Sequence, residues 1–265
     1  MYTGIKKIVY EHILPVAGMI TAHRDRIPVI YYHDVVPGEG STFMRTNRDV
    51  FLQQMDWLKK EGYQTLLFSE PDKDLKKQSN EKKVLIAFDD GWLSNYTIVF
   101  PEMMKREMKF NIFIANKYIN QGGRFLDWNM LRAMVGSGIV GVGAHTYNHI
   151  DSKLIKTDEI FSNEITAANE EIEKELGFVP TDFCFPYGYY DEQIVNRLAE
   201  EQTYQRLYTS NTIEPVCLND CVIIGRTGIS TDDSIKVFRH KVRDHYRVMK
   251  YYSRMVGAGE LEFHA

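Results

Sequence analysis

Residues 85–92 read LIAFDDGW, a run of mostly apolar residues that ends in two adjacent carboxylates and a glycine. A short apolar run with a glycine near its end is typical of a buried β-strand. Asp89 and Asp90 would then lie side by side where that strand ends, although like charges repel and an unpaired buried carboxylate is costly. We therefore expect another group in the fold to offset that cost.

Segments with the periodicity of strands and of helices alternate along the rest of the chain. Such alternation is typical of parallel βα units, and the number of units favours a closed or nearly closed barrel over an open sheet. The chemistry of such barrels lies at the C-terminal ends of the strands. The predicted strands are 27–32, 63–68, 84–88, 110–115, 140–144, 181–185, 206–209 and 222–228. The predicted helices are one that begins at Asn47, then 101–108, 128–135, 157–176, 191–200 and a last helix from 232 to about 256.

Length and composition indicate one globular domain with a short extension. The chain has 265 residues, of which 44% are hydrophobic and 26% are charged, enough to bury a substantial core. We expect residues 1–26 to form an N-terminal helical extension that docks on the domain or on a membrane surface, and residues 27–265 to form the domain. The net charge of −4 gives no global basic character, so we expect no nucleic-acid partner.

The cysteines and the N-terminal sequence bear on the location of the protein in the cell. The chain has an odd number of cysteines, Cys184, Cys217 and Cys221, and no two of them form a CxxC pair. This pattern favours reduced thiols over a disulfide framework. Glu11 and Pro15 interrupt the first apolar residues, and no stretch has the length and apolar character of a membrane span. The sequence therefore predicts a cytoplasmic protein and leaves its oligomeric state open.

Polar residues follow three of the predicted strands directly. They lie in the segments AFDDGW (87–92), GAHTYNHI (143–150) and FCFPYGYY (183–190). If the βα units are parallel, all three segments lie on the same rim of the barrel.

The second of these segments suggests a metal site. His145 and His149 are four residues apart, and two imidazoles with one carboxylate are good ligands for zinc and similar divalent ions. Asp90 would supply that carboxylate, while Asp89 would stay free to act as a general base. A lone HxxxH or a lone DDG occurs in many ordinary loops, so it is their joint placement on one rim that favours a catalytic site.

The motifs AFDDG, HTYNH and FPYG, in this order and at these separations, resemble those of the polysaccharide deacetylases of carbohydrate esterase family 4, over roughly residues 27–230. The resemblance implies an α/β fold, a distorted (β/α) barrel of about seven parallel strands. It also implies an acetylated carbohydrate as substrate, mostly an N-acetylated sugar. One divalent metal would serve as cofactor, with zinc favoured and cobalt, nickel or manganese as alternatives.

The resemblance also implies roles for individual residues. Asp89 matches the general base of the family, and Tyr187 matches a tyrosine whose backbone N–H helps to hold the oxyanion. Trp128 matches an aromatic residue often found near the substrate groove, although a core aromatic residue is an equal alternative. The metal ligands of the family match Asp90, His145 and His149.

Two departures from the common family pattern narrow the subgroup. Cys184 stands where the third motif usually has an arginine that pairs with the base aspartate. Arg226 is our candidate for the missing partner, and an arginine with a purely structural role is an equal alternative. The apolar strand in IPVIYYHDV, near the N-terminus, stops at His33. In most of the family the strand that ends in a histidine comes near the C-terminus. Its early position here resembles the branch that deacetylates poly-N-acetylglucosamine, in which that strand is moved to the front of the chain.

The predicted reaction is therefore metal-assisted hydrolysis of an N-acetyl amide. Asp89 would take the proton of the attacking water, and the metal and the Tyr187 N–H would polarise the acetyl carbonyl. His33 would protonate the leaving amine, because an amine leaves poorly until it is protonated. Two alternatives stay open: an O-acetyl carbohydrate esterase that uses the same site, and a glycan-binding domain that has lost catalysis.

The last predicted helix has one apolar stripe and a strongly basic remainder. A basic amphipathic helix can lie on anionic lipid, which would make the protein peripheral to a membrane. A core-facing stripe beneath a solvated charged face is the favoured alternative, because a barrel needs such helices. The stripe consists of Ile235, Phe238, Val242, Tyr246 and Met249.

Overall fold

A mostly parallel sheet lies at the centre of the structure, a computed structural model. The structure describes residues 13, 16, 18–19, 25–38, 44–78, 80–202, 204–211, 215–218 and 221–245. The strands of the sheet are β1 (Val29–Tyr32), β4 (Gln64–Leu66), β5 (Lys83–Asp90), β6 (Phe110–Ile114), β7 (Val140–Ala144), β8 (Asp182–Cys184), β9 (Arg206–Thr209), β10 (Val216–Leu218), β11 (Cys221–Gly225) and β12 (Thr227–Gly228). Their order is β10-β11-β9-β8-β7-β6-β5-β1-β12, and β4 pairs with the start of β5.

The hydrogen-bond ladder of this sheet does not close into a ring. β11 pairs with β9, whereas β12 pairs with β1, and Arg226 is the single residue between β11 and β12. The chain itself therefore joins the two sides of the sheet at this residue. Nine of the ten described strands of the sheet pair in parallel, against about seven predicted, because β4 adds a short strand and β11 and β12 are two parts of one predicted strand. The predicted α/β, barrel-like fold is confirmed.

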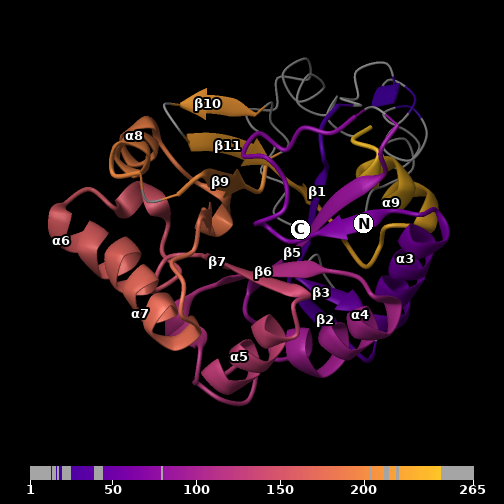
Figure 1. The fold of residues 1–265 in the computed structure, drawn as a ribbon, viewed down its shortest axis with the longest axis horizontal. Helices are drawn as coiled ribbons and strands as arrows, with labels where there is room; N and C mark the ends of the chain where they lie inside the picture. Colours follow the sequence, from indigo (N-terminus) through magenta and orange to yellow (C-terminus); the bar gives the residue numbers. More distant parts are fainter. Residues whose placement is uncertain are drawn as a thin grey trace.

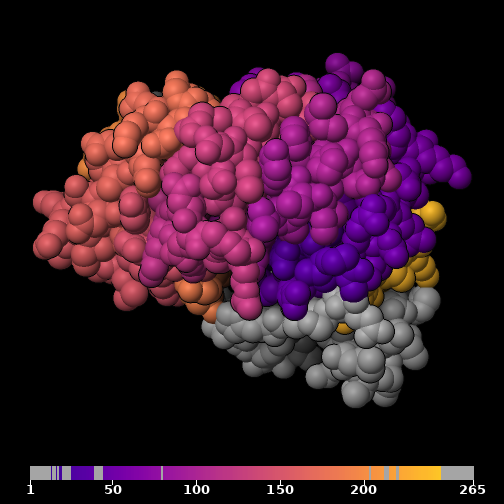
Figure 2. Space-filling model, turned by 90° about the horizontal axis from the view of Figure 1, so that it is seen from below, coloured from indigo at the N-terminus to yellow at the C-terminus, as the bar shows by residue number. Residues whose placement is uncertain are grey.

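The helices lie around the outside of the sheet (Figure 1). Asn47 caps the first of them as predicted, because its side chain accepts hydrogen bonds from two backbone N–H groups of the first turn. Figure 2 shows successive segments as neighbouring colour bands, as expected for βα units added one after another. The helices are α3 (Arg48–Lys60), α4 (Phe100–Arg106), α5 (Trp128–Gly136), α6 (Asp158–Phe161), α7 (Ala167–Leu176), α8 (Glu192–Glu200) and α9 (Ile235–Val242).

Two predicted elements are interrupted in the structure. The helix predicted over 157–176 contains a π-helical turn, η5 (Ser162–Thr166), between α6 and α7. The strand predicted over 222–228 is broken at Arg226, where the chain changes its pairing partner from β9 to β1. Neither interruption changes the apolar periodicity of its segment, so the sequence pattern does not reveal them.

Three short strands are absent from the prediction. β2 (Asp34–Val36) and β3 (Arg45–Asn47) form a separate parallel pair, and β10 pairs antiparallel with β11. Three residues are too few to give a periodic signal.

The chain ends agree only partly with the prediction. The predicted extension 1–26 lies almost wholly outside the described residues. The last helix was expected to reach about residue 256, but α9 ends at Val242, and Asp244 takes a left-handed φ of 61° that a continuing helix cannot contain. Residues 246–265 lie outside the described residues.

The part of the apolar stripe that the structure describes packs on the protein core. Phe238 and Val242 are buried, and the ring of Phe238 lies against Trp57 of α3. Among the described helices, none combines the length and the apolar character needed to cross a membrane. The predicted membrane contact and the predicted location stay predictions.

The buried apolar residues form two clusters, one on each face of the sheet. Successive side chains of a strand point to opposite faces. Ile86 and Phe88 therefore pack outward under the helices, while Leu85 and Ala87 join the inner cluster. Asp89 continues the inner series of β5 by the same alternation. The inner cluster also contains Val29, Tyr31, Phe113, Cys184, Tyr208, Val222 and Ile224.

Candidate metal centre and active site

The predicted polar residues lie at the C-terminal ends of the parallel strands. β1 leads into His33, β5 ends with Asp89 and Asp90, and β7 leads into His145. The pairing registers keep the ends of β5, β6, β7 and β8 level with one another. Residues that are far apart in the sequence therefore meet on one rim, as the parallel architecture predicts.

Three of these residues form a compact group of ligand atoms. The Nε2 atoms of His149 and His145 lie 3.2 Å and 3.7 Å from Oδ1 of Asp90. One ligand atom from each residue lies within 4.8 Å of the others. Asp90 has an unusual φ of 75°, which turns its side chain away from the regular alternation of β5. The structure thus brings together the three residues predicted to be metal ligands.

Neighbouring groups orient two of these ligands. Nδ1 of His145 lies 2.7 Å from the carbonyl oxygen of Cys184, and because a carbonyl can only accept, Nδ1 carries the proton and Nε2 presents a lone pair. Nε1 of Trp92 donates to Oδ2 of Asp90 at 3.1 Å, which leaves Oδ1 toward the histidines. Burial lowers the pKa of His145 to about 4, so its imidazole is neutral and able to ligate at neutral pH.

The arrangement fits a divalent metal ion. Oδ1 of Asp90 is buried and has no hydrogen-bond partner within the described part of the chain. A bare buried carboxylate oxygen facing two imidazole nitrogens is costly without a cation. Two nitrogen ligands and one oxygen ligand are a set that zinc and similar ions accept, with further coordination positions left open.

The carboxylate of Asp89, the neighbour of Asp90, has a different partner. Arg226 donates two hydrogen bonds of 2.7 Å to the two carboxylate oxygens of Asp89, in a bidentate geometry. Its guanidinium lies 4.1 Å from the ring centroid of Tyr31 and 5.3 Å from that of Phe113. Burial raises the pKa of Asp89, but Arg226 more than offsets this, so the pKa of the carboxyl lies below its ordinary value. Arg226 therefore pairs with Asp89, as the sequence suggested for the residue that replaces the arginine missing at Cys184.

Breaking this buried pair should strongly destabilise the fold. Arg226→Met removes the guanidinium and leaves Asp89 uncompensated, which costs about 3–5 kcal/mol in comparable buried pairs. Urea unfolding at neutral pH measures the loss. The matched control is Arg45→Met, because Arg45 is 57% exposed and pairs with Asp34 at 3.5 Å, a class of pair worth about 0–1 kcal/mol.

The pH dependence gives this prediction a second readout. Asp89 has a lowered pKa in the folded protein, so the stability from the pair is present above the ordinary pKa of an aspartate. It is lost as the pH falls through the lowered value. The difference between the variant and the wild type should therefore shrink in acid, and a difference that is equally large at low pH would contradict the pairing as its cause.

His33 lies beside Asp89 on the same rim. Its Nε2 is 4.0 Å from Oδ2 of Asp89, and its ring packs edge-on against Tyr31. The carboxylate of the next residue, Asp34, accepts a hydrogen bond from Ser94 and pairs with Arg45. The structure therefore brings His33 and Asp89 together, as the sequence predicted.

The two predicted aromatic residues lie in different surroundings. Tyr187 takes a left-handed φ of 60° and is 55% exposed, and its ring centroid lies 4.8 Å from that of His149. Trp128 is only 5% exposed and belongs to the main hydrophobic core. We therefore do not carry Trp128 into the proposed site.

Aromatic residues that the sequence prediction omitted lie beside the metal ligands instead. The ring of Trp92 packs on Phe125, Phe125 stacks on Tyr118, and Tyr118 contacts His149. Trp92 stands two positions after Asp90 in the opening segment, so its place beside the site could have been inferred from the strand end. Tyr118 ends the short 3₁₀-helix η3 (Asn116–Tyr118) and Phe125 lies in the segment that follows it, so neither gives such a signal.

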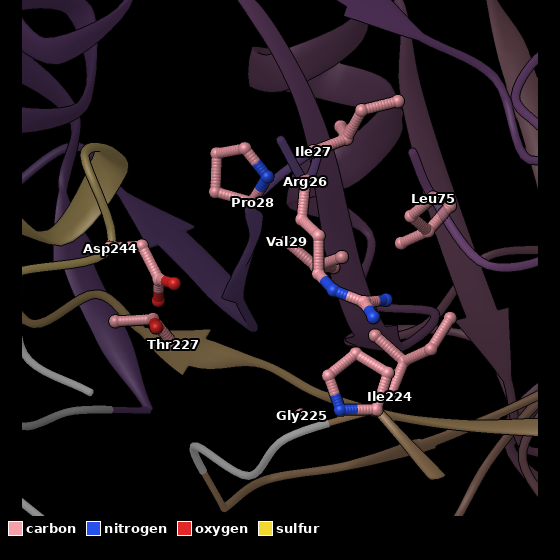
Figure 3. A pocket seen from close by; sticks show the side chains of 10 residues that line it. Arg26, Ile27, Pro28, Val29, Leu75, Ile224, Gly225, Thr227 and Asp244 are labelled. Atoms are coloured by element: carbon pink, nitrogen blue, oxygen red, sulfur yellow. The ribbon is translucent and has the colours of Figure 1, made fainter. Parts of the chain in front are cut away.

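The pocket in Figure 3 lies away from this rim. It is lined by residues that include Arg26, Val29, Leu75, Ile224 and Asp244, and contains none of the predicted site residues. Val29 is the first residue of β1, whereas His33 follows its last residue. The pocket is thus beside the opposite end of β1, and we assign it no part in the site.

Comparison with known families agrees with this geometry. The family model for polysaccharide deacetylases matches residues 76–206, which include Asp89, the group of Asp90, His145 and His149, and the FPYG motif. The chain therefore carries a polysaccharide deacetylase domain, and the family predicted from its motifs is confirmed.

Individual proteins show the same relationship. YxkH of Bacillus subtilis (strain 168), a provisionally named polysaccharide deacetylase, is 30% identical over 182 residues, which are 68% of this chain and 63% of that protein. The poly-beta-1,6-N-acetyl-D-glucosamine N-deacetylase of Escherichia coli (strain K12) is 27% identical over 142 residues, 48% of this chain and 21% of that protein. This chain thus spans less than two thirds of either relative. The solved structure of IcaB from Ammonifex degensii has a TM-score of 0.69 and 25% identity, over 84% of this chain and 97% of that one.

Proposed function

We propose that this protein is a metal-dependent hydrolase that removes N-acetyl groups from a sugar or polysaccharide. The observation that carries the proposal is the buried group of Asp90, His145 and His149 beside an aspartate that Arg226 holds in its charged form. The name of the Escherichia coli relative supports an N-acetylglucosamine polymer as the substrate class. The paired, charged Asp89 also argues against a domain that has lost catalysis.

We propose zinc as the ion, held by Asp90, His145 and His149. A bound divalent ion would supply positive charge that makes water more acidic and polarises the acetyl carbonyl. The protein contributes by keeping the imidazole of His145 neutral and oriented, and by leaving Oδ1 of Asp90 toward the two histidines.

The remaining steps belong to groups of this protein itself. Asp89 accepts the proton of the attacking water, and Arg226 keeps this carboxylate deprotonated between turnovers. The backbone N–H of Tyr187 donates a hydrogen bond to the acetyl oxygen as negative charge develops on it. His33 gives a proton to the nitrogen that leaves. The products are acetate and a free amine.

The role of His33 separates an amide hydrolase from an esterase. His33→Ala should keep zinc and fold but lower turnover of N-acetyl substrates by about 10²-fold or more, because the amine no longer receives a proton. An activated aryl acetate, whose leaving group needs no proton, should be affected much less. Turnover of both substrates and zinc content are measured on the same preparation. Equal loss on both substrates would count against the acid role, and loss of zinc would make His33 a ligand.

The function itself is tested by acetate release from a panel of acetylated carbohydrates. We expect release from N-acetylglucosamine oligomers that exceeds release from O-acetylated sugars of the same length. Preference for the O-acetylated sugars would establish an esterase. Glycan binding with no acetate release, in protein that contains zinc, would establish a binding domain.

A further inference from the structure

The two histidines of the metal-ligand group are held in different ways. Nδ1 of His145 is bonded to the carbonyl of Cys184, the usual arrangement for a metal-binding imidazole. Nδ1 of His149 is buried and has no hydrogen-bond partner within the described residues. Its ring touches the rings of Tyr118, His145 and Tyr187, which bound a slot but supply no directional bond. The position of His149 must therefore be fixed mainly through its backbone.

The backbone around His149 is strained. Thr146 has a φ of 58° and His149 has a φ of 56°, in the left-handed region that residues other than glycine rarely adopt. Such conformations persist only where surrounding contacts over-determine them. The segment 146–149 thus needs an external hold to present Nε2 of His149 to Asp90.

Glu164 supplies that hold. Its carboxylate accepts hydrogen bonds from the backbone N–H of Asn148 at 2.9 Å and from Nδ2 of Asn148 at 2.8 Å. Its carbonyl oxygen accepts the N–H of Tyr147 at 2.9 Å. Glu164 is 5% exposed and lies on the π-helical turn η5, between α6 and α7 in Figure 1. Single π-helical turns are frequent at functional sites, which gives this interruption of the helix a purpose.

We propose that Glu164, through Asn148, is a positioning residue for the metal ligand His149. The inference rests on the proposed metal site, and it assigns to Glu164 the outer-partner role that the Cys184 carbonyl has for His145. Losing such a partner typically weakens metal binding by about 10- to 100-fold without removing a ligand.

Zinc binding to the metal-stripped protein tests this proposal without any turnover. Zinc dissociation constants are measured by competition with a chromophoric chelator, and urea unfolding of each variant shows that it is folded. Glu164→Gln keeps size but turns one acceptor into a donor that faces Asn148, so we expect zinc affinity to fall about 10-fold or more. The matched control is Glu170→Gln, because Glu170 is an exposed glutamate of α7, and its zinc affinity should equal that of the wild type.

A paired substitution makes the test specific to this contact. Glu164→Gln together with Asn148→Asp reverses the side-chain hydrogen bond, keeps the net charge and leaves the backbone N–H of residue 148 with an acceptor. We expect the pair to recover most of the lost zinc affinity. Asn148→Ala is the smaller perturbation, to be measured if a folded Glu164→Gln protein is not obtained, and it should also weaken zinc binding.

The outcomes separate the failure of this inference from the failure of the proposed site. Wild-type zinc affinity in folded Glu164→Gln or Asn148→Ala protein would overturn the positioning role while the metal site stands. If zinc affinity falls in Glu164→Gln and the paired substitution does not restore it, the hydrogen bonds between Glu164 and Asn148 are not what positions His149. If the wild type binds zinc no better than His149→Ala does, the proposed metal site fails, and the inference fails with it.

Discussion

His145→Ala should abolish zinc binding and acetate release together. The variant removes one of two nitrogen ligands and also empties the position whose Nδ1 is fixed by Cys184. The remaining aspartate and histidine form a two-ligand set, well short of the three protein ligands that catalytic zinc sites use. Zinc content after dialysis and acetate release from an N-acetylglucosamine oligomer are measured on the same sample.

A second histidine variant, outside the site, shows whether the loss of zinc and activity is specific to His145. His240→Ala changes a histidine of α9 that is not among the potential metal ligands of the described residues, which are Asp90, His145 and His149 and a second group of Asp89, His145 and Cys184. It should keep both zinc and activity. A His145→Ala protein that is folded and retains wild-type zinc and activity would mean that the ligand set is wrongly assigned.

Asp89→Asn should separate catalysis from metal binding. An asparagine has nearly the shape of an aspartate but cannot accept the proton, so turnover should fall by at least about 10²-fold. Zinc should be retained, because Asp90, and not Asp89, is grouped with both histidines, whereas Asp89 is grouped with only one of them, His145. Asp90→Asn should have the opposite signature and bind zinc weakly. Equal loss of zinc in both variants would make both carboxylates ligands and place the base elsewhere.

The buried partner of Asp89 complicates the single variant and suggests a better one. Asp89→Asn leaves the guanidinium of Arg226 buried without a counter-charge, so the protein should lose stability as well as turnover. Combining Asp89→Asn with Arg226→Met replaces the ion pair with uncharged side chains. Stability should then recover while turnover stays low. Recovery of turnover in the double variant would show that lost structure, and not the lost base, had slowed the single one.

The local motifs could be read from the sequence because their geometry is local. Asp89 and Asp90 are neighbours at a strand end, and His145 and His149 are separated by one short turn after another strand. Parallel βα order then suffices to place both pairs on one rim. The family resemblance added roles to residues that this geometry had already brought together.

Contacts across the barrel could not be read in the same way. The hydrogen bonds between Arg226 and Asp89 join residues 137 positions apart in the sequence. The sequence alone therefore could not decide between this pairing and a purely structural role for the arginine. Trp128 and Trp92 are both tryptophans near motifs, but only packing distinguishes a core position from one beside Asp90. The π-helical turn that carries Glu164 has the same apolar pattern as an ordinary helix, and so gave no signal.

Titration of metal-stripped protein with zinc, with acetate release from an N-acetylglucosamine oligomer followed at each step, tests the central claim most directly. A single site made by Asp90, His145 and His149 predicts no release without metal. Release should rise in proportion to bound zinc and level off at about one ion per chain. Acetate release that persists in the metal-free protein, or none at full zinc occupancy, would contradict the account.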